Sequence, residues 1–230
     1  FLFFMAIGPK VKWIKDNFYN LKINFIILFG AVFINFFIFF FFKSYSLLSN
    51  LILISSIFLI ISTTRDSINL LKNKEFNLSR IMAHFSFGLL ILFIGLNYNF
   101  SSEKDFNLKV GEVKKFEDFS IKFQDLNLKE LKNYKAVIGT FEIDDYKDNA
   151  KLFLSPQIRI YENPNTLTYE ASIRSGLLKD FYITMSNIDR SEYYNIKFQK
   201  KPFMIWIWIS VILISLSGFL RFFKYENKNY

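Results

Sequence analysis

Residues 23–42 read INFIILFGAVFINFFIFFFF, and this stretch decides the class of the protein. It carries no charge, and Asn24 and Asn35 are its only strongly polar side chains. An α-helix rises about 1.5 Å per residue, so roughly 20 apolar residues cross the hydrocarbon core of a bilayer. Because lipid offers no hydrogen-bond partner to the backbone, such a segment has to be helical. The stretch therefore predicts a membrane-spanning helix.

Three further segments have the same character. Residues 46–63 and 202–219 hold no charge, and residues 81–98 hold no formal charge but contain His84. We therefore expect a membrane region at 1–99 with spans at about 23–42, 46–63 and 81–98. A last span and a short cytoplasmic tail are expected at 202–230. The apolar residues 1–7 are expected to be the tail of another span, in a chain that is the C-terminal piece of a longer protein.

Basic residues beside the spans predict the direction of crossing. Eleven Lys and Arg lie on one side of the predicted bundle, whereas Lys43 stands alone on the other. The eleven are Lys10, Lys12, Lys15, Lys22, Arg65, Lys72, Lys74, Arg80, Arg221, Lys224 and Lys228. Basic flanks stay inside, so residues 100–201 are expected outside, in a bacterial periplasm or, alternatively, a mitochondrial intermembrane space.

Residues 100–201 predict a water-facing β domain. Apolar and polar side chains alternate in short runs, as in half-buried strands. The runs are residues 119–124, 137–143, 152–155, 158–161, 181–185 and 193–198. We expect about six or seven strands in a small antiparallel barrel or sandwich. The predicted fold class is a membrane α-helical bundle of four transmembrane helices with an inserted antiparallel β domain on the outer side.

Charge and composition exclude several kinds of site. The predicted domain holds seventeen Lys and Arg against sixteen Asp and Glu, so the net charge of +9 comes mostly from the membrane flanks. A domain so nearly neutral argues against nucleic acid as a partner, and membrane lipid is the expected partner of the basic flanks. The chain has no Cys and one His, so these residues alone provide no disulfide, thiolate site or multi-His metal site.

His84 is the strongest candidate for chemistry. It lies in the third predicted span, one helical turn past Arg80. Ionisable side chains inside a membrane are costly, usually face the bundle interior and often serve a function. An imidazole can hold haem iron from one face, and Ala83, Ser86 and Gly88 would leave room beside it for a planar group. The alternative is an interfacial His bonded to a carbonyl or a headgroup.

Other candidates lie in or beside the β domain. Arg159 and Glu170 could form an ion pair, or bind a propionate or a partner; the alternative is a solvated strand face. Trp206 and Trp208 open the last span, where an aromatic belt at the outer interface is the simplest interpretation. The sequence has no Gly-rich phosphate loop, no credible catalytic carboxylate pair and no Ser-His-Asp arrangement, so no catalytic residue is predicted.

Five stretches in order resemble the C-terminal part of the CcmF family, which includes NrfE and comprises haem-lyase membrane proteins of c-type cytochrome maturation. They are Met5-Ala-Ile-Gly-Pro-Lys-Val-Lys-Trp, Met82-Ala-His-Phe-Ser-Phe-Gly, Ser155-Pro-Gln-Ile-Arg-Ile-Tyr, Glu170-Ala-Ser-Ile followed by Asp180-Phe-Tyr-Ile, and Lys201-Pro-Phe-Met-Ile-Trp-Ile-Trp. The resemblance covers nearly the whole chain. Departures from the family's usual residues stand at Phe85, Ser86, Gln157, Ile158 and Tyr169.

The resemblance implies that His84 is one of two transmembrane histidines that ligate a b-type haem, haem b, with the second ligand upstream of Phe1. It also implies partners: the haem chaperone CcmE, apocytochrome c and a thiol-handling maturation subunit of the CcmH type. Residues expected to bind a partner or to support the structure are Arg159, Tyr161, Glu170, Asp180, Trp206 and Trp208.

The resulting hypothesis is the C-terminal part of a haem-handling or haem lyase subunit in a bacterial inner membrane, with a mitochondrial inner membrane as the alternative. It would help to transfer haem from the chaperone to apocytochrome c, whose own thiols would react. Whether the chain is itself an enzyme stays open. The rivals are a non-catalytic membrane scaffold that docks assembly partners through the β domain, and a transporter subunit. The predicted spans hold no Asp, Glu, Lys or Arg, which disfavours the transporter.

Overall fold

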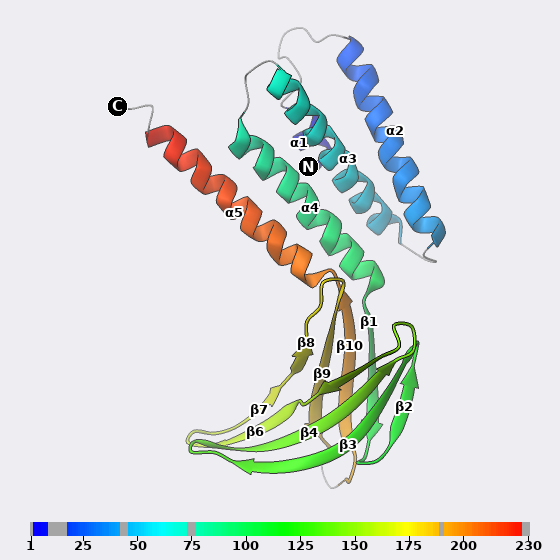
Figure 1. Cartoon of the computed structure of the whole chain (residues 1–230), viewed down its shortest axis with the longest axis vertical. Coiled ribbons are helices and arrows are strands. Elements are labelled where there is room, and N and C mark those ends of the chain that lie inside the picture. The colour runs from blue at the N-terminus through cyan, green and yellow to red at the C-terminus, as the bar shows by residue number, and fades with distance from the viewer. Residues whose placement is uncertain (1, 9–17, 42–45, 73–76, 189–190, 227–230) are drawn as a thin grey trace. The chain divides into compact units, whose positions relative to one another are not determined.

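The computed structural model describes residues 2–8, 18–41, 46–72, 77–188 and 191–226. The chain divides into two compact units. The helical unit combines Phe1–Phe100 with Phe203–Tyr230, and the β unit is Ser101–Pro202. Figure 1 labels the elements of each unit.

Among the residues that the structure describes, the helical unit contains one short helix and four long ones. They are α1 (Leu2–Ile7), α2 (Phe18–Phe41), α3 (Leu47–Lys72), α4 (Leu78–Phe100) and α5 (Met204–Glu226). In Figure 1, α2, α3, α4 and α5 lie side by side in that order, and α1 packs against α3. Each long helix contains a stretch long and apolar enough to cross a membrane: Lys22–Phe40, Leu47–Leu71, Leu78–Phe100 and Met204–Phe222. This confirms the prediction of a multi-pass membrane bundle.

Local hydrogen bonds explain where two of the helices begin. The Ser46 hydroxyl accepts from the backbone N–H of Ser49 at 3.2 Å, and the Asn77 side chain accepts from that of Arg80 at 3.4 Å. Both are N-cap bonds, which satisfy amide groups that have no partner within the helix. At its other end, α3 runs on past Thr63 to Lys72, because an apolar run can end before its helix does.

The described part of the β unit is built from ten antiparallel strands. They are β1 (Ser102–Leu108), β2 (Val113–Phe116), β3 (Phe119–Glu130), β4 (Tyr134–Asp145), β5 (Ala150–Leu154), β6 (Gln157–Glu162), β7 (Asn165–Glu170), β8 (Ser172–Arg174), β9 (Lys179–Asn187) and β10 (Tyr194–Pro202). One sheet has the order β1-β10-β9-β8, and the other has the order β2-β3-β4-β6-β7 with β5 also paired to β4. The predicted antiparallel β domain is confirmed.

The expectation of six or seven strands was wrong. The strands without a prediction are β1, β2, β7 and β8, and most of their side chains are exposed or half-buried. A strand that buries neither face shows no alternation of apolar and polar residues, so periodicity does not find it. Pro202 closes β10 opposite Lys179, and α5 begins at Met204, so Lys200 and Lys201 lie in a strand.

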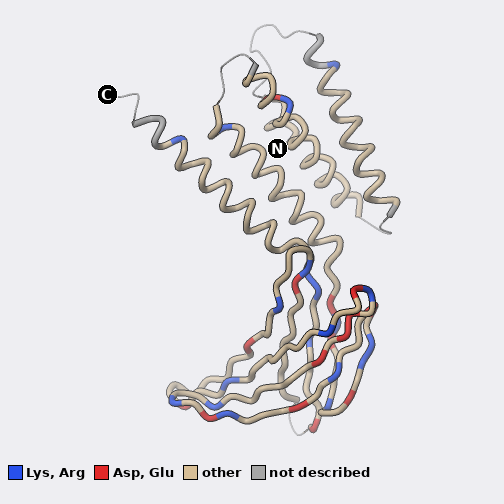
Figure 2. The backbone as a smooth tube through the Cα atoms, viewed as in Figure 1, with Lys and Arg blue, Asp and Glu red and all other residues tan. Residues whose placement is uncertain are grey.

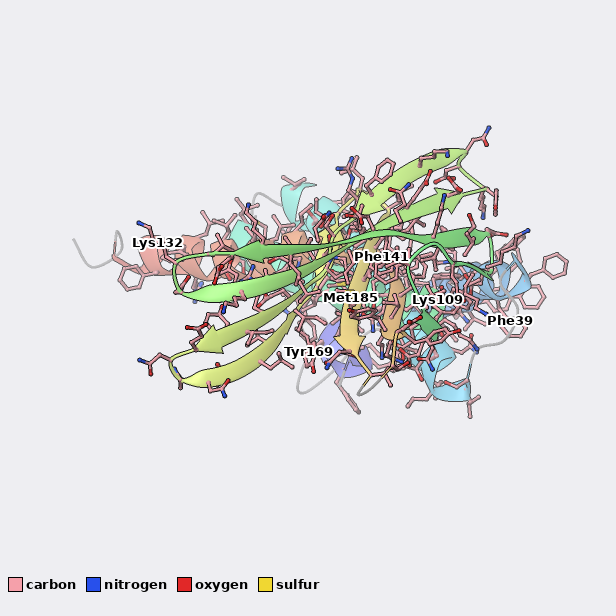
Figure 3. The ribbon with its side chains drawn as sticks, turned by 90° about the horizontal axis from the view of Figure 1, so that it is seen from below. Phe39, Lys109, Lys132, Phe141, Tyr169 and Met185 are labelled. Atoms are coloured by element: carbon pink, nitrogen blue, oxygen red, sulfur yellow. The ribbon has the colours of Figure 1, made fainter. Side chains whose placement is uncertain are left out.

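Aromatic and aliphatic side chains from both sheets fill the core of the β unit. Phe123 and Phe141 are fully buried on neighbouring strands, and their rings stack with centroids 4.4 Å apart. Met185 of β9 faces them from the other sheet and is also buried (Figure 3). Gly139 of β4 lies against this cluster, where an added Cβ would stand 2.7 Å from Sδ of Met185. The core is therefore closely packed.

Charged residues divide sharply between the two units. In Figure 2 they are scattered over all the strands of the β unit, while the middle of each long helix is free of them. This distribution suits helices surrounded by lipid and strands surrounded by water.

Candidate functional site

His84 lies in the first half of α4, where the cap at Asn77 sets the start of the helix. The side chain is half-buried and lines a small space of about 20 Å³ between α1, α3 and α4. The other lining residues are Met5, Ala6, Thr63, Asp66, Leu70, Arg80 and Ile81. His84 therefore faces the neighbouring helices of its own unit.

One ring nitrogen of His84 stands out. Its Nδ1 is buried, and no described residue forms a hydrogen bond with it. A buried polar atom without a partner costs free energy comparable to a lost hydrogen bond, so such an atom calls for an explanation. In the tautomer that leaves Nδ1 unprotonated, its lone pair would be available to a group that these residues do not provide.

The surroundings of His84 test whether a haem fits there. Imidazole is a suitable axial ligand, so the donor type fits one iron bond. Within the described parts of the chain no three His, Cys, Asp or Glu side chains gather into a metal site. The space of about 20 Å³ is also far smaller than a porphyrin. The fit thus rests on the donor atom and not on a preformed pocket.

The expectation that small residues leave room for a planar group beside His84 was wrong for Gly88. A Cβ added at Gly88 would stand 2.8 Å from Cγ1 of Ile60 in α3. Ser86 is buried as well, with 1% of its surface exposed. Gly88 therefore lets α3 and α4 approach closely, as small residues often do between membrane helices.

Arg159, Tyr161 and Glu170 come together on one face of the larger sheet. Nη1 of Arg159 lies 3.7 Å from Oε1 of Glu170, and its Nε donates to Gln157 at 3.1 Å. Its guanidinium also lies 5.0 Å from the ring centre of Tyr134, which in turn packs on Tyr161 with ring centres 5.2 Å apart. The face is partly exposed, so the arrangement can stabilise the sheet and can also meet a partner.

Asp180 does not belong to that cluster. It lies in β9 of the smaller sheet and is 5% exposed. Its carboxylate accepts from the N–H of Gly176 at 3.0 Å, the hydroxyl of Ser175 at 3.3 Å and the hydroxyl of Tyr182 at 3.4 Å. Burial and the nearby charge of Asp180 raise the pKa of Tyr182. Asp180 therefore holds the loop between β8 and β9.

The two tryptophans at the start of α5 have different surroundings. Trp206 stacks on Phe93 of α4 with ring centres 5.6 Å apart, and 38% of its surface is exposed. Trp208 is 63% exposed. Trp206 thus joins two helices, and the assignment of the two tryptophans to an aromatic belt stays a prediction.

Sequence reasoning missed the ionic contact that joins Lys179 to the end of β4. Its Nζ lies 2.5 Å from Oδ2 of Asp145 and 2.6 Å from Oδ2 of Asp148. Nothing local marks the partner, because the contact joins residues 34 positions apart in two sheets.

Comparisons with known proteins agree with this architecture. The family described as CcmF C-terminal beta-sandwich matches residues 99–202. The cytochrome c-type biogenesis protein CcmF of Haemophilus influenzae is 27% identical over 97% of this chain and 36% of its own length. The CcmF of Escherichia coli is 24% identical over 62% of this chain and 22% of its own length.

A solved structure described as cytochrome c heme lyase CcmF shares the fold. Its TM-score is 0.72 at 16% sequence identity, over 94% of this chain and 37% of that one. The chain thus spans about a third of the length of the relative and the solved structure that match nearly all of it. The chain is thus similar to CcmF cytochrome c-type biogenesis proteins: residues 99–202 match their C-terminal β-sandwich, and the likeness to the Haemophilus influenzae protein extends over nearly the whole chain.

Proposed function

We propose that the chain is part of a haem-handling, haem lyase subunit of c-type cytochrome biogenesis, in which His84 is one axial ligand of a membrane haem b. The observation that carries the proposal is the buried Nδ1 of His84, which has no hydrogen-bond partner among the described residues. A haem held there would supply one-electron redox chemistry. His84 would hold the iron and set its position within the bundle.

A second axial ligand would have to come from outside these residues. His84 is the only His of the chain, which also has no Cys. Two imidazoles on opposite faces are a common way to hold haem iron, so a His of another segment is the natural partner. We therefore assign only half of the ligation to this chain.

The proposed partners follow from the chemistry that the chain lacks. Attachment of haem to a cytochrome requires thiols, and this chain has none, so the reacting thiols would belong to apocytochrome c. We propose that haem arrives from the chaperone CcmE and that a CcmH-type subunit handles the thiols. The face with Arg159, Tyr161 and Glu170 is a candidate contact for one of these partners or for a haem propionate.

The proposed location of the β unit is the periplasm of a bacterium. The support is the distribution of basic residues beside the four spans, eleven against one, which predicts which flanks remain inside. A domain on that outer side would meet apocytochrome c after its export. Labelling of introduced cysteines with a membrane-impermeant reagent in intact cells would test this location.

The haem proposal is tested with His84→Ala in the full-length protein, purified in detergent. The expected result is loss of the reduced b-type absorption bands, because one axial bond is missing. Ser86→Ala is the matched control, since it changes a buried side chain of the same helix and removes no ligand; it should keep the bands. Added imidazole should restore part of the spectrum if the variant is folded. A b-type spectrum that survives His84→Ala unchanged would refute the ligand assignment.

A further inference from the structure

The loop between β8 and β9 exposes two adjacent leucines. Leu177 is 70% exposed and Leu178 is 65% exposed. Single exposed leucines are normal on protein surfaces, but a neighbouring pair at a loop tip gathers apolar surface in one place. The next two residues along the chain, Lys179 and Asp180, begin β9. The pair therefore sits at one end of the smaller sheet.

The loop that carries these leucines is held in a defined conformation. Asp180 binds the two residues before them, through the hydroxyl of Ser175 and the N–H of Gly176. A Cβ added at Gly176 would stand 2.8 Å from the carbonyl oxygen of Lys179, so the turn also requires glycine. Lys179, which follows the leucines, forms ion pairs with Asp145 and Asp148. The residues on both sides of the two leucines are therefore held in place by hydrogen bonds and ion pairs.

Strand register places the loop beside both junctions of the β unit with the helices. Lys179 is the register partner of Pro202, the last residue of β10, and Met204 begins α5. On the other side of β10, Ser102 is the partner of Lys200, and α4 ends at Phe100. The leucines therefore lie at the end of the sheet where the chain enters and leaves two membrane spans.

This position coincides with the expected level of the membrane interface. Trp206 and Trp208 follow Pro202 by only a few residues, and tryptophans at the end of a span favour the headgroup region. In a β-sheet, neighbouring strands lie about 4.8 Å apart, so Lys179 lies close to Pro202. Leu178 is thus one residue from the register partner of Pro202.

The charge around the loop suits lipid headgroups. Arg174, at the start of the loop, is exposed and forms no ion pair with any residue that the structure describes. Lys201 lies one residue before Pro202 and packs over the ring of Tyr182, with Nζ 5.3 Å from its centre. Basic side chains next to apolar ones are attracted to the anionic surface of a membrane.

We propose that Leu177 and Leu178 insert into the lipid interface and dock the β unit on the membrane that the helices span. Arg174 and Lys201 would contact the headgroup phosphates. The occupant is the bilayer and not a protein, because the loop lies at the points where the chain enters lipid. The proposal concerns a different place from His84 and does not depend on the haem assignment.

The test uses the absence of cysteine from the chain. A single introduced Cys is the only thiol, so Leu177→Cys and Leu178→Cys can each be labelled with an environment-sensitive fluorophore. The whole labelled chain is reconstituted in phosphatidylcholine–phosphatidylglycerol vesicles, with or without nitroxide-labelled lipid. We expect a blue-shifted emission at both positions and loss of that emission when nitroxide lipid is present.

Leu128→Cys is the matched control. Leu128 lies in β3 and is 81% exposed. Its register partner in β4 is Val137, and both lie near the turn between the two strands, which contains Lys132, labelled in Figure 3. Asp145, which binds Lys179, lies eight residues beyond Val137 at the other end of β4, roughly 27 Å away at about 3.4 Å per residue of strand. A label at Leu128 should therefore keep its emission.

Three results would overturn the proposal. Labels at the loop could show no shift and no quenching, which would place them in water. They could show a shift without quenching, which would mean that protein covers them. Equal quenching at Leu128 would mean that the loop has no special contact with lipid. Near-UV circular dichroism confirms folding of each variant, and the two loop positions are tested separately, so failure of one variant leaves the other.

Discussion

The ammonium group of Lys179 at the start of β9 lies 2.5 Å from Oδ2 of Asp145 at the end of β4. The Asp145 side chain is 2% exposed, whereas that of Lys179 is 28% exposed. The contact joins the two sheets of the β unit at the end where β9 begins. A buried carboxylate needs such a partner, because the loss of its hydration is otherwise costly in free energy.

Asp145→Asn should destabilise the β unit by about 1–3 kcal/mol, the usual cost when a buried charged hydrogen bond is broken. Lys179 keeps Asp148 at 2.6 Å, which limits the loss. Hydrogen exchange of β4 and β9 in the whole detergent-solubilised chain measures the change. Asp148→Asn is the control: its side chain is 53% exposed, and its loss should cost less than about 1 kcal/mol. Equal effects of both variants would contradict this account.

The same contact should make the stability of the β unit depend on pH. Burial alone would raise the pKa of Asp145, but hydrogen bonds from Lys179 and from the backbone of Asp148 and Lys147 outweigh it and hold the pKa below its usual value. The folded state therefore gains stability above the unfolded pKa of about 4 and loses it as the pH falls through the folded pKa. Urea unfolding at a series of pH values measures this loss, and Asp145→Asn should make the free energy of unfolding depend less on pH in the acid range. An unchanged pH dependence would contradict the assignment.

At the alkaline end the sign is reversed. Burial lowers the pKa of Lys179, but its bonds to Asp145 and Asp148 raise it more, so the folded pKa lies above the usual value. This stabilisation is complete below the unfolded pKa of about 10.4 and is lost as the pH rises through the folded one. The contact should thus contribute a constant amount to the free energy of unfolding of the β unit between about pH 5 and 9.

How far the sequence predicted the fold depended on which side chains each element buries. The spans were recognised because lipid demands a long apolar run. Strands β3, β4 and β9 were recognised because one face of each is buried and the other is not. In β7 every side chain is exposed or half-buried. The strand is held by its pairing with β6, and no local sequence pattern predicts that pairing.

The candidate site was predicted unevenly for a similar reason. His84 was singled out by its type and its place in a span, without any knowledge of its neighbours. The ion pair of Arg159 and Glu170 was one of several hypotheses, and only the pairing of β6 with β7 brings the two together. The role of Asp180 in holding a loop could not be predicted, because it depends on the backbone conformation that brings Ser175 and Gly176 within hydrogen-bond distance of its carboxylate.

Phe123→Ala should destabilise the β unit by about 3–5 kcal/mol, because it removes a fully buried ring that stacks on Phe141 and leaves a cavity. Urea unfolding of the whole chain in detergent, followed by near-UV circular dichroism, measures the loss. Phe153→Ala is the matched control, since Phe153 of β5 is 59% exposed and its removal should cost about 0.5 kcal/mol or less. Similar costs at both positions would mean that the core lies elsewhere.

Gly139→Ala tests the packing between the two sheets. The new Cβ would stand 2.7 Å from Sδ of Met185 and 2.9 Å from Cε2 of Phe141, and both neighbours are buried. Added atoms in a filled core typically cost about 1–3 kcal/mol, because side chains are forced from their preferred rotamers. Met185→Ala removes the nearest atoms, so Gly139→Ala should cost less in that background than in the natural chain. A double-mutant cycle by urea unfolding measures this coupling. Additive effects would show that Met185 already has room to move aside, and that strain from Gly139→Ala arises at Phe141 or in the backbone of β4.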